Sequence, residues 1–148
     1  MERGAASPQT GGMPTNTATA RATAAARVRV FVVEDSPAIR ERIEELVVLA
    51  GGAAAGHAGG VGCATRAILE CRPDIVILDM QLADGTGFDV LRAVRREAPE
   101  IDVYFLSNTA ATPYRQLAER LGARGFFDKS REFDRVREVI AQRVQATH

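Results

Sequence analysis

The sequence predicts an α/β fold in which a doubly wound, five-stranded parallel sheet is covered by five helices. Short strand-like runs alternate along the chain with longer segments whose apolar residues recur every three or four positions, the pattern of repeated βαβ units. One run, Ile75–Leu78, is apolar at every position, which is typical of a strand covered on both faces. Several runs end in polar residues, and a parallel sheet brings such ends together at one side.

Composition fits one globular domain and argues against two classes of partner. The chain has 148 residues, no formal net charge and a pI near 6.7, so nothing indicates a nucleic-acid footprint or a membrane-binding patch. Cys63 and Cys71 lack the spacing of metal ligands. The sequence shows neither a transmembrane run nor the apolar core of a signal peptide, and we therefore expect a soluble, cytoplasmic protein.

The amino-terminal third contains a tail, a strand and a helix. Residues 1–26 are rich in Ala, Thr, Gly and Pro and are expected to form a disordered tail before a folded domain at 27–148. A strand at 28–33 is followed by Ser36 and Pro37, which suit the N-cap and first turn of a helix. The apolar face of that helix is formed by Ile39, Ile43, Leu46, Val47 and Ala50, and Gly51-Gly52 ends it.

The remaining elements continue the alternation. Ala53–Ala58 is predicted as the second strand from its place in the order, because its strand propensity is poor. The other predicted elements are a helix from about Cys63 to Cys71, the strand 75–78, a loop at 84–87, a helix carrying Phe88, Leu91, Val94 and Ala98, a strand at 102–107, a helix at 112–121, a strand at 125–128, and a last helix carrying Phe133, Val136, Ile140 and Val144.

Four of the predicted strands end in groups that suit phosphoryl chemistry. The groups are Glu34-Asp35, Asp79, Ser107 and Asp128-Lys129. Three carboxylates at one place repel one another, and Mg²⁺, which prefers a few oxygen ligands, removes the conflict. Lys129, the sole lysine of the chain, and a nearby hydroxyl suit a phosphoryl group. The pattern predicts a magnesium-assisted phosphoryl site with Asp79 as nucleophile.

These residues, in this order, resemble the receiver domain of bacterial two-component response regulators over roughly residues 27–146. The resemblance implies a flavodoxin-like sheet with strand order 2-1-3-4-5. Because one helix follows Lys129 and no output module is apparent after it, we expect a stand-alone, chemotaxis-type receiver. Such a protein would signal through protein contacts and catalyse only its own phosphorylation and dephosphorylation.

The resemblance also implies a role for each site residue. Asp79 would accept the phosphoryl group from a phosphohistidine on a histidine kinase or histidine phosphotransfer protein. Asp35 would bind Mg²⁺ directly, Glu34 through a water, and Gln81 through its backbone carbonyl, with Asp79 as a further ligand. Lys129 would pair with the phosphoryl oxygens.

Further residues would govern switching and access. Ser107 would hydrogen-bond the new phosphate, and Phe126 would then swing from an exposed to a buried position. Gln81, Asn108 and Thr109 would set access to the phosphorylation site. The downstream protein target would bind the face made by the fourth helix, fifth strand and fifth helix, through which we expect a monomer or a weak dimer.

Four positions depart from the common receiver pattern. Ala83 and Ser130 stand where many receivers have Pro, the latter often in a cis peptide, and a cis bond to a non-proline costs about 3 kcal/mol. Asn108 replaces a small residue and is expected to narrow access to the site. Phe126 replaces a frequent Tyr. None of these changes removes a group that the reaction needs.

Three other functions are alternatives for a chain with this pattern. The first is a pseudo-receiver that binds proteins without phosphorylation. The second is a phosphohydrolase of the haloacid dehalogenase type, which needs a second Asp where this chain has Gln81. The third is a flavin or nucleotide carrier, which needs a glycine-rich phosphate loop where this chain has Glu34–Pro37.

Overall fold

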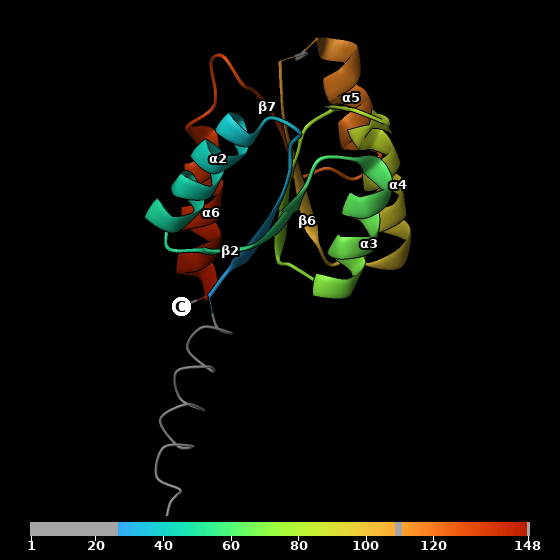
Figure 1. Cartoon of the computed structure of the whole chain (residues 1–148). Helices are drawn as coiled ribbons and strands as arrows, with labels where there is room; N and C mark the ends of the chain where they lie inside the picture. The colour runs from blue at the N-terminus through green and yellow to red at the C-terminus, as the bar shows by residue number, and fades with distance from the viewer. Residues whose placement is uncertain (1–26, 109–110, 148) are drawn as a thin grey trace, which may run out of the picture.

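A central parallel sheet organises the molecule, as Figure 1 shows. The computed structural model describes residues 27–108 and 111–147. The sheet strands are β1 (Arg29–Val33), β2 (Ala53–Ala58), β3 (Ile75–Leu78), β6 (Asp102–Ser107) and β7 (Gly125–Asp128). Their order is β2-β1-β3-β6-β7, and every neighbouring pair is parallel. The predicted order, in which the second strand precedes the first and the others follow in sequence, is confirmed.

Five described helices cover the two faces of this sheet. They are α2 (Pro37–Leu49), α3 (Val61–Cys71), α4 (Gly87–Glu97), α5 (Thr112–Arg120) and α6 (Arg135–Thr147). Helices α2 and α6 lie on one face and α3, α4 and α5 on the other (Figure 1). This is the doubly wound arrangement that the alternation of strands and helices predicts. Among the described residues, no helix has both the length and the apolar character needed to cross a bilayer.

The central strand β3 belongs to both halves of the core. Val76 and Leu78 pack in the apolar cluster beneath α3, α4 and α5, whereas Ile75 and Ile77 pack in the cluster beneath α2 and α6. All four side chains are at most 1% exposed. The unbroken apolar run is therefore explained, since successive side chains of a strand point to opposite faces.

The structure refines two of the predicted boundaries and leaves a third undescribed. The tail predicted at residues 1–26 lies outside the described residues. Helix α3 begins two residues earlier than predicted, at Val61, because the Asp84 side chain accepts a hydrogen bond from the Val61 N–H at 2.7 Å. Helix α6 begins only at Arg135, so Phe133 precedes it.

A small hairpin lies where a loop was predicted. Strand β4 (Gln81–Leu82) pairs antiparallel with β5 (Gly85–Thr86) directly after Asp79. Two-residue strands are too short to show an alternating pattern, so the sequence gives no signal for them. The hairpin leads into α4, whose first residue, Gly87, donates its N–H to the Met80 carbonyl at 2.7 Å.

Gly87 supports a stability prediction because its surroundings are rigid. A Cβ at this position would lie 2.5 Å from the Asp79 carbonyl oxygen and 2.7 Å from the Phe105 ring, whereas a Cβ at Gly62 would meet nothing within 4 Å. We expect Gly87→Ala to lower the free energy of unfolding by about 1–3 kcal/mol. Gly62→Ala, the matched control in α3, should raise it by up to about 1 kcal/mol.

Urea unfolding of both variants, with the slope of the transition compared with that of the wild type, measures this difference. Equal midpoints for the two variants would contradict the packing assigned to the start of α4.

Candidate functional site

The ends of β1 and β3 bring three carboxylates together. Oxygens of Glu34, Asp35 and Asp79 all lie within 4.8 Å of one another. Backbone hydrogen bonds fix two of these positions, since Glu34 N–H donates to the Ala58 carbonyl at 2.9 Å and Asp79 N–H donates to the Val33 carbonyl at 3.0 Å. Glu34 and Asp79 are buried, at 3% and 8% exposure, while Asp35 is exposed. The predicted acidic cluster is therefore formed by the fold.

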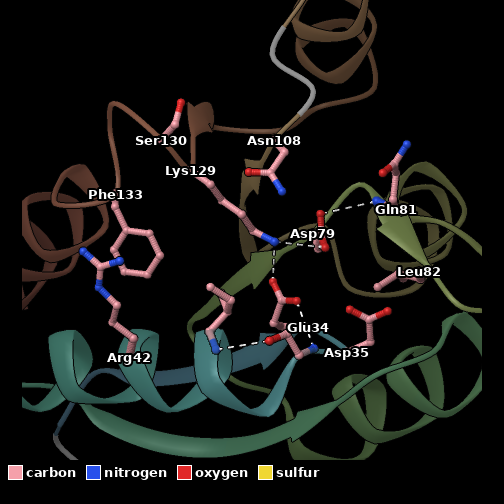
Figure 2. A pocket seen from close by; sticks show the side chains of 12 residues that line it. Glu34, Asp35, Arg42, Asp79, Gln81, Leu82, Asn108, Lys129, Ser130 and Phe133 are labelled. Atoms are coloured by element: carbon pink, nitrogen blue, oxygen red, sulfur yellow. Dashed lines mark hydrogen bonds and ion pairs between the residues drawn. The ribbon is translucent and has the colours of Figure 1, made fainter.

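Lys129 enters this cluster from the end of β7. Its Nζ lies 2.6 Å from Glu34 Oε1 and 3.2 Å from Asp79 Oδ2, and Figure 2 shows the side chain extending between the two carboxylates. The Lys129 N–H also donates to the Ser107 carbonyl at 3.0 Å. Because its side chain is only 10% exposed, water screens the three charges weakly.

Burial and charge act on these groups in opposite directions. Burial raises the pKa of the Glu34 carboxyl above its ordinary value, and the contact with Lys129 opposes that rise. Burial also lowers the pKa of the Lys129 ammonium, but Glu34 and Asp79 outweigh it, so that this pKa lies above 10.5. Lys129 is therefore held charged. One ammonium among three carboxylates leaves the cluster with an excess of negative charge.

An open cavity of about 470 Å³ gives access to this cluster. Its lining residues are Glu34, Asp35, Ser36, Ile39, Arg42, Asp79, Gln81, Leu82, Asn108, Lys129, Ser130 and Phe133. The Gln81 N–H points to Asp79 Oδ1 at 3.4 Å. The exposed Asn108 side chain extends toward the space beside Asp79 and Lys129 (Figure 2). Gln81 and Asn108 thus line the cavity, and their effect on access stays a prediction. Thr109 lies outside the described residues.

One wall of the cavity was not predicted. The Arg42 guanidinium lies 4.0 Å from the centre of the Phe133 ring, a cation–π contact between α2 and the segment before α6. The sequence pattern predicts Phe133 within the last helix and indicates no role for Arg42. Arg42 follows Ile39 by three residues, a spacing that puts both side chains on the face of α2 that lines the cavity. The sequence could therefore have indicated the side of Arg42, but its partner Phe133 required the tertiary fold.

The two residues predicted to switch lie on neighbouring strands. Ser107 is buried at the end of β6. Phe126 in β7 is 7% exposed and stacks on Phe105, with 5.3 Å between ring centres. The structure thus has Phe126 in the buried position, and its outward position and movement stay a prediction.

The peptide after Lys129 differs from the common receiver geometry, as its sequence suggested. The described residues contain no cis peptide bond. Ser130 instead donates its N–H and its hydroxyl to Asp128 Oδ1, at 2.8 and 2.6 Å. These hydrogen bonds lower the pKa of the exposed Asp128 carboxyl. Asp128 therefore organises the turn that carries Lys129.

Comparison with known proteins identifies the family. The family model of the response regulator receiver domain matches residues 30–141. The chain belongs to this family. Its solved structural relatives include the receiver domain of a putative LuxO repressor protein from Vibrio parahaemolyticus, with a TM-score of 0.73, 24% identity, and coverage of 82% of this chain and 92% of the other. A CheY-like receiver from Methanospirillum hungatei has a TM-score of 0.72 and 18% identity, covering 80% and 94% of the two chains.

Curated relatives of this receiver are longer proteins. Regulatory protein LuxO of Vibrio cholerae is 33% identical over 82 residues, which cover 55% of this chain and 18% of LuxO. The DNA-binding transcriptional activator DevR/DosR of Mycobacterium tuberculosis is 29% identical over 107 residues, which cover 69% of this chain and 48% of that protein. This chain therefore spans less than half of either relative.

The acidic cluster of the receiver fits a hard divalent cation. Its donors are carboxylate oxygens, the ligands that Mg²⁺ prefers, and they carry more negative charge than Lys129 neutralises. The exposed Asp35 leaves one side of the cluster open to water, which suits a metal that retains part of its hydration shell. Glu34, Asp35 and Asp79 are the side chains that would hold the ion.

The exposure of Asp35 allows a test of metal binding. We expect Asp35→Asn to weaken Mg²⁺ binding about 10- to 100-fold, because it removes one charged donor without disturbing the buried pair of Glu34 and Lys129. Glu41→Gln, an exposed acid on α2 that lies outside the cluster, should bind as the wild type does. Isothermal titration with MgCl₂ measures both, and equal affinity in the two variants would refute the assigned ligand set.

Lys129 makes the electrostatics directly measurable, because a chain with one lysine gives a single signal after ¹³Cε-lysine labelling. We expect this signal to titrate above pH 10.5 in the wild type and closer to 10.5 in Glu34→Gln. The raised pKa means that the charged pair stabilises the fold fully below pH 10.5. That stabilisation is lost as the pH rises through the folded-state value.

A titration midpoint at or below 10.5 in the wild type would contradict the ion pairs assigned to Lys129.

Proposed function

We propose that this receiver accepts a phosphoryl group on Asp79 from a phosphohistidine, with Mg²⁺ as its cofactor. The observation that carries the proposal is the position of the Asp79 carboxylate. It lies at the floor of an open cavity, 3.2 Å from Lys129 Nζ and within the cluster that Glu34 and Asp35 complete. The donor would be a histidine kinase or histidine phosphotransfer protein, acting with the receiver in the cytoplasm.

The chemical step is a displacement at phosphorus. A carboxylate oxygen of Asp79 attacks, a P–O bond forms, and the P–N bond to the donor imidazole breaks. The imidazole leaves with the electron pair and takes a proton from water. Bound Mg²⁺ would neutralise the charge that builds up on the phosphoryl oxygens.

Residues of this chain assist before and after the transfer. The buried ammonium of Lys129 is already charged and lies beside Asp79, so it would pair with the phosphoryl oxygens without reorganising the site. The Gln81 N–H orients Asp79 through Oδ1. We further propose that Ser107 hydrogen-bonds the new phosphate and that Gln81 supplies its backbone carbonyl to the metal.

The phosphorylated receiver would act through protein contacts. In this structure the predicted output face corresponds to α5, β7 and α6. Its buried aromatic residue, Phe126, lies between the core residue Phe105 and α5, a position from which a change in the core would reach the surface. We assign no enzymatic activity beyond the formation and loss of the receiver's own phosphoaspartate.

Intact-mass spectrometry tests the assignment of Asp79. Incubation with Mg²⁺ and acetyl phosphate should add one phosphoryl group to the wild type and to the control Asp134→Asn, whose carboxylate is exposed outside the cavity. Asp79→Asn, or omission of Mg²⁺, should abolish the addition. A wild type that binds Mg²⁺ but acquires no phosphoryl group from acetyl phosphate or a phosphorylated phosphotransfer protein would favour the pseudo-receiver.

Asn108 should limit the speed of both phosphorylation and hydrolysis. Its side chain lines the cavity beside Asp79, so shortening it in Asn108→Ala should raise both rates by about three- to tenfold, corresponding to less than 1.4 kcal/mol of barrier. Time courses of the phosphorylated mass measure the two rates. Unchanged rates in Asn108→Ala would show that this side chain does not restrict access.

A further inference from the structure

An ion pair joins helix α5 to the segment that carries Lys129. Arg115, in α5, donates from Nη2 to Glu132 Oε1 at 3.0 Å and from Nη1 to the Phe126 carbonyl at 2.6 Å. The Arg115 guanidinium carbon also lies 5.4 Å from the centre of the Phe126 ring. One side chain of α5 thus contacts both the backbone and the ring of the predicted switch residue.

Glu132 extends this contact to the residue before Lys129. Its Oε1 accepts a hydrogen bond from the Asp128 N–H at 3.0 Å, and its own N–H donates to the Asp128 carbonyl at 2.7 Å. The Asp128 backbone hydrogen bond and the Arg115 guanidinium lower the pKa of the Glu132 carboxyl. Glu132 therefore stays ionised at neutral pH, and its carboxylate bridges Asp128 to Arg115.

Because β7 is an edge strand of the sheet, contacts with side chains outside the sheet help to hold it in place. This strand is the last in the sheet and pairs only with β6, so a backbone ladder holds it on one side. Lys129 follows Phe126 by three positions, a distance of about 10 Å in an extended strand. The Arg115–Glu132 pair holds two positions within that length, Phe126 and Asp128, against α5.

We propose that Arg115 and Glu132 are positioning residues that couple the place of Lys129 to the conformation of α5. The inference rests on the proposed phosphoryl transfer to Asp79. When a phosphoryl group draws the Lys129 ammonium away from Glu34, the end of β7 moves. The ion pair transmits this movement to α5, whose exposed surface includes Tyr114 at 41% exposure. The same pair restrains Phe126 in its buried position.

A purely structural role would predict a different result. If the pair only stabilised the fold, its loss would lower the unfolding free energy but leave the response of α5 to phosphorylation intact. Both side chains are about one-third exposed, and pairs this open to water contribute little to stability. Arg115→Ala is therefore expected to fold, which allows the response itself to be measured.

Amide hydrogen exchange across Thr112–Arg120 measures that response, with Mg²⁺ and beryllofluoride as the phosphoryl mimic. The matched control is Arg124→Ala. Arg124 is an exposed arginine next to β7 whose side chain contacts Asp102 at 3.7 Å. The wild type and this control should show a change in α5 exchange of about fivefold or more on adding the mimic. Arg115→Ala should bind the mimic and show less than about a third of that change.

Glu132→Gln provides a second variant. It keeps a side-chain oxygen for the Asp128 N–H but removes the charge opposite Arg115, so it should give an intermediate response. If Arg115→Ala does not fold, Glu132→Gln serves as the test variant in its place. A wild-type response of α5 in Arg115→Ala, or in Glu132→Gln in that case, would overturn the coupling.

Failure of the proposed function would give a separate result. If the wild type binds no beryllofluoride and acquires no phosphoryl group, Asp79 is not a working acceptor, and the positioning role is then judged without the mimic. Faster amide exchange at Asp128 and Lys129 in Arg115→Ala than in Arg124→Ala, with equal exchange in the central strand β3, would support that role. Equal exchange in the two variants would overturn it.

Discussion

The contact of one buried ammonium with two buried carboxylates is the interaction on which the rest of the site depends. Lys129 lies 2.6 Å from Glu34 and 3.2 Å from Asp79, in a setting where unpaired charge would be costly. The cluster still contains more carboxylates than Lys129 neutralises, so its excess negative charge favours binding of a divalent cation. A phosphoryl group on Asp79 would then compete with Glu34 for the same ammonium. The charge balance of the site, the binding of a cation and the response to phosphorylation therefore all depend on the charged groups of Glu34, Asp79 and Lys129.

The fold places this set without using flexible segments. Glu34 and Asp79 directly follow β1 and β3, two adjacent strands. The backbone of Asp79 bonds to Val33 in β1, and that of Glu34 bonds to Ala58 in β2. Lys129 directly follows β7, at the far edge of the sheet. The acids are thus held by the rigid centre, whereas the ammonium is held by a strand with only one neighbour. This asymmetry is why we propose that the end of β7 moves, and the contacts of Arg115 and Glu132 lie where such a movement would reach helix α5.

The sequence was sufficient for the parallel sheet, its strand order and the meeting of Glu34, Asp35, Asp79 and Lys129, because strand ends in a parallel sheet converge by geometry. Even β2, with its poor strand propensity, was placed correctly by the alternation. The sequence did not predict features that depend on contacts between particular side chains or on very short strands. The Arg42–Phe133 wall of the cavity joins residues 91 positions apart along the chain, and the β4–β5 hairpin is too short to show a periodic pattern. The bridge from Arg115 through Glu132 to Asp128 likewise depends on distances that no local pattern encodes.

We expect Lys129 to exchange Glu34 for the phosphoryl group when Asp79 is phosphorylated, and the proposed response of the receiver depends on this exchange. The most direct test is to follow the single ¹³Cε-lysine signal at constant pH while Mg²⁺ and acetyl phosphate are added, with Mg²⁺ alone and the Asp79→Asn variant as references. The account predicts a new signal in the wild type that grows with the phosphorylated mass and is absent from both references. A phosphorylated wild type whose lysine signal matches that of the Mg²⁺-only sample would contradict it.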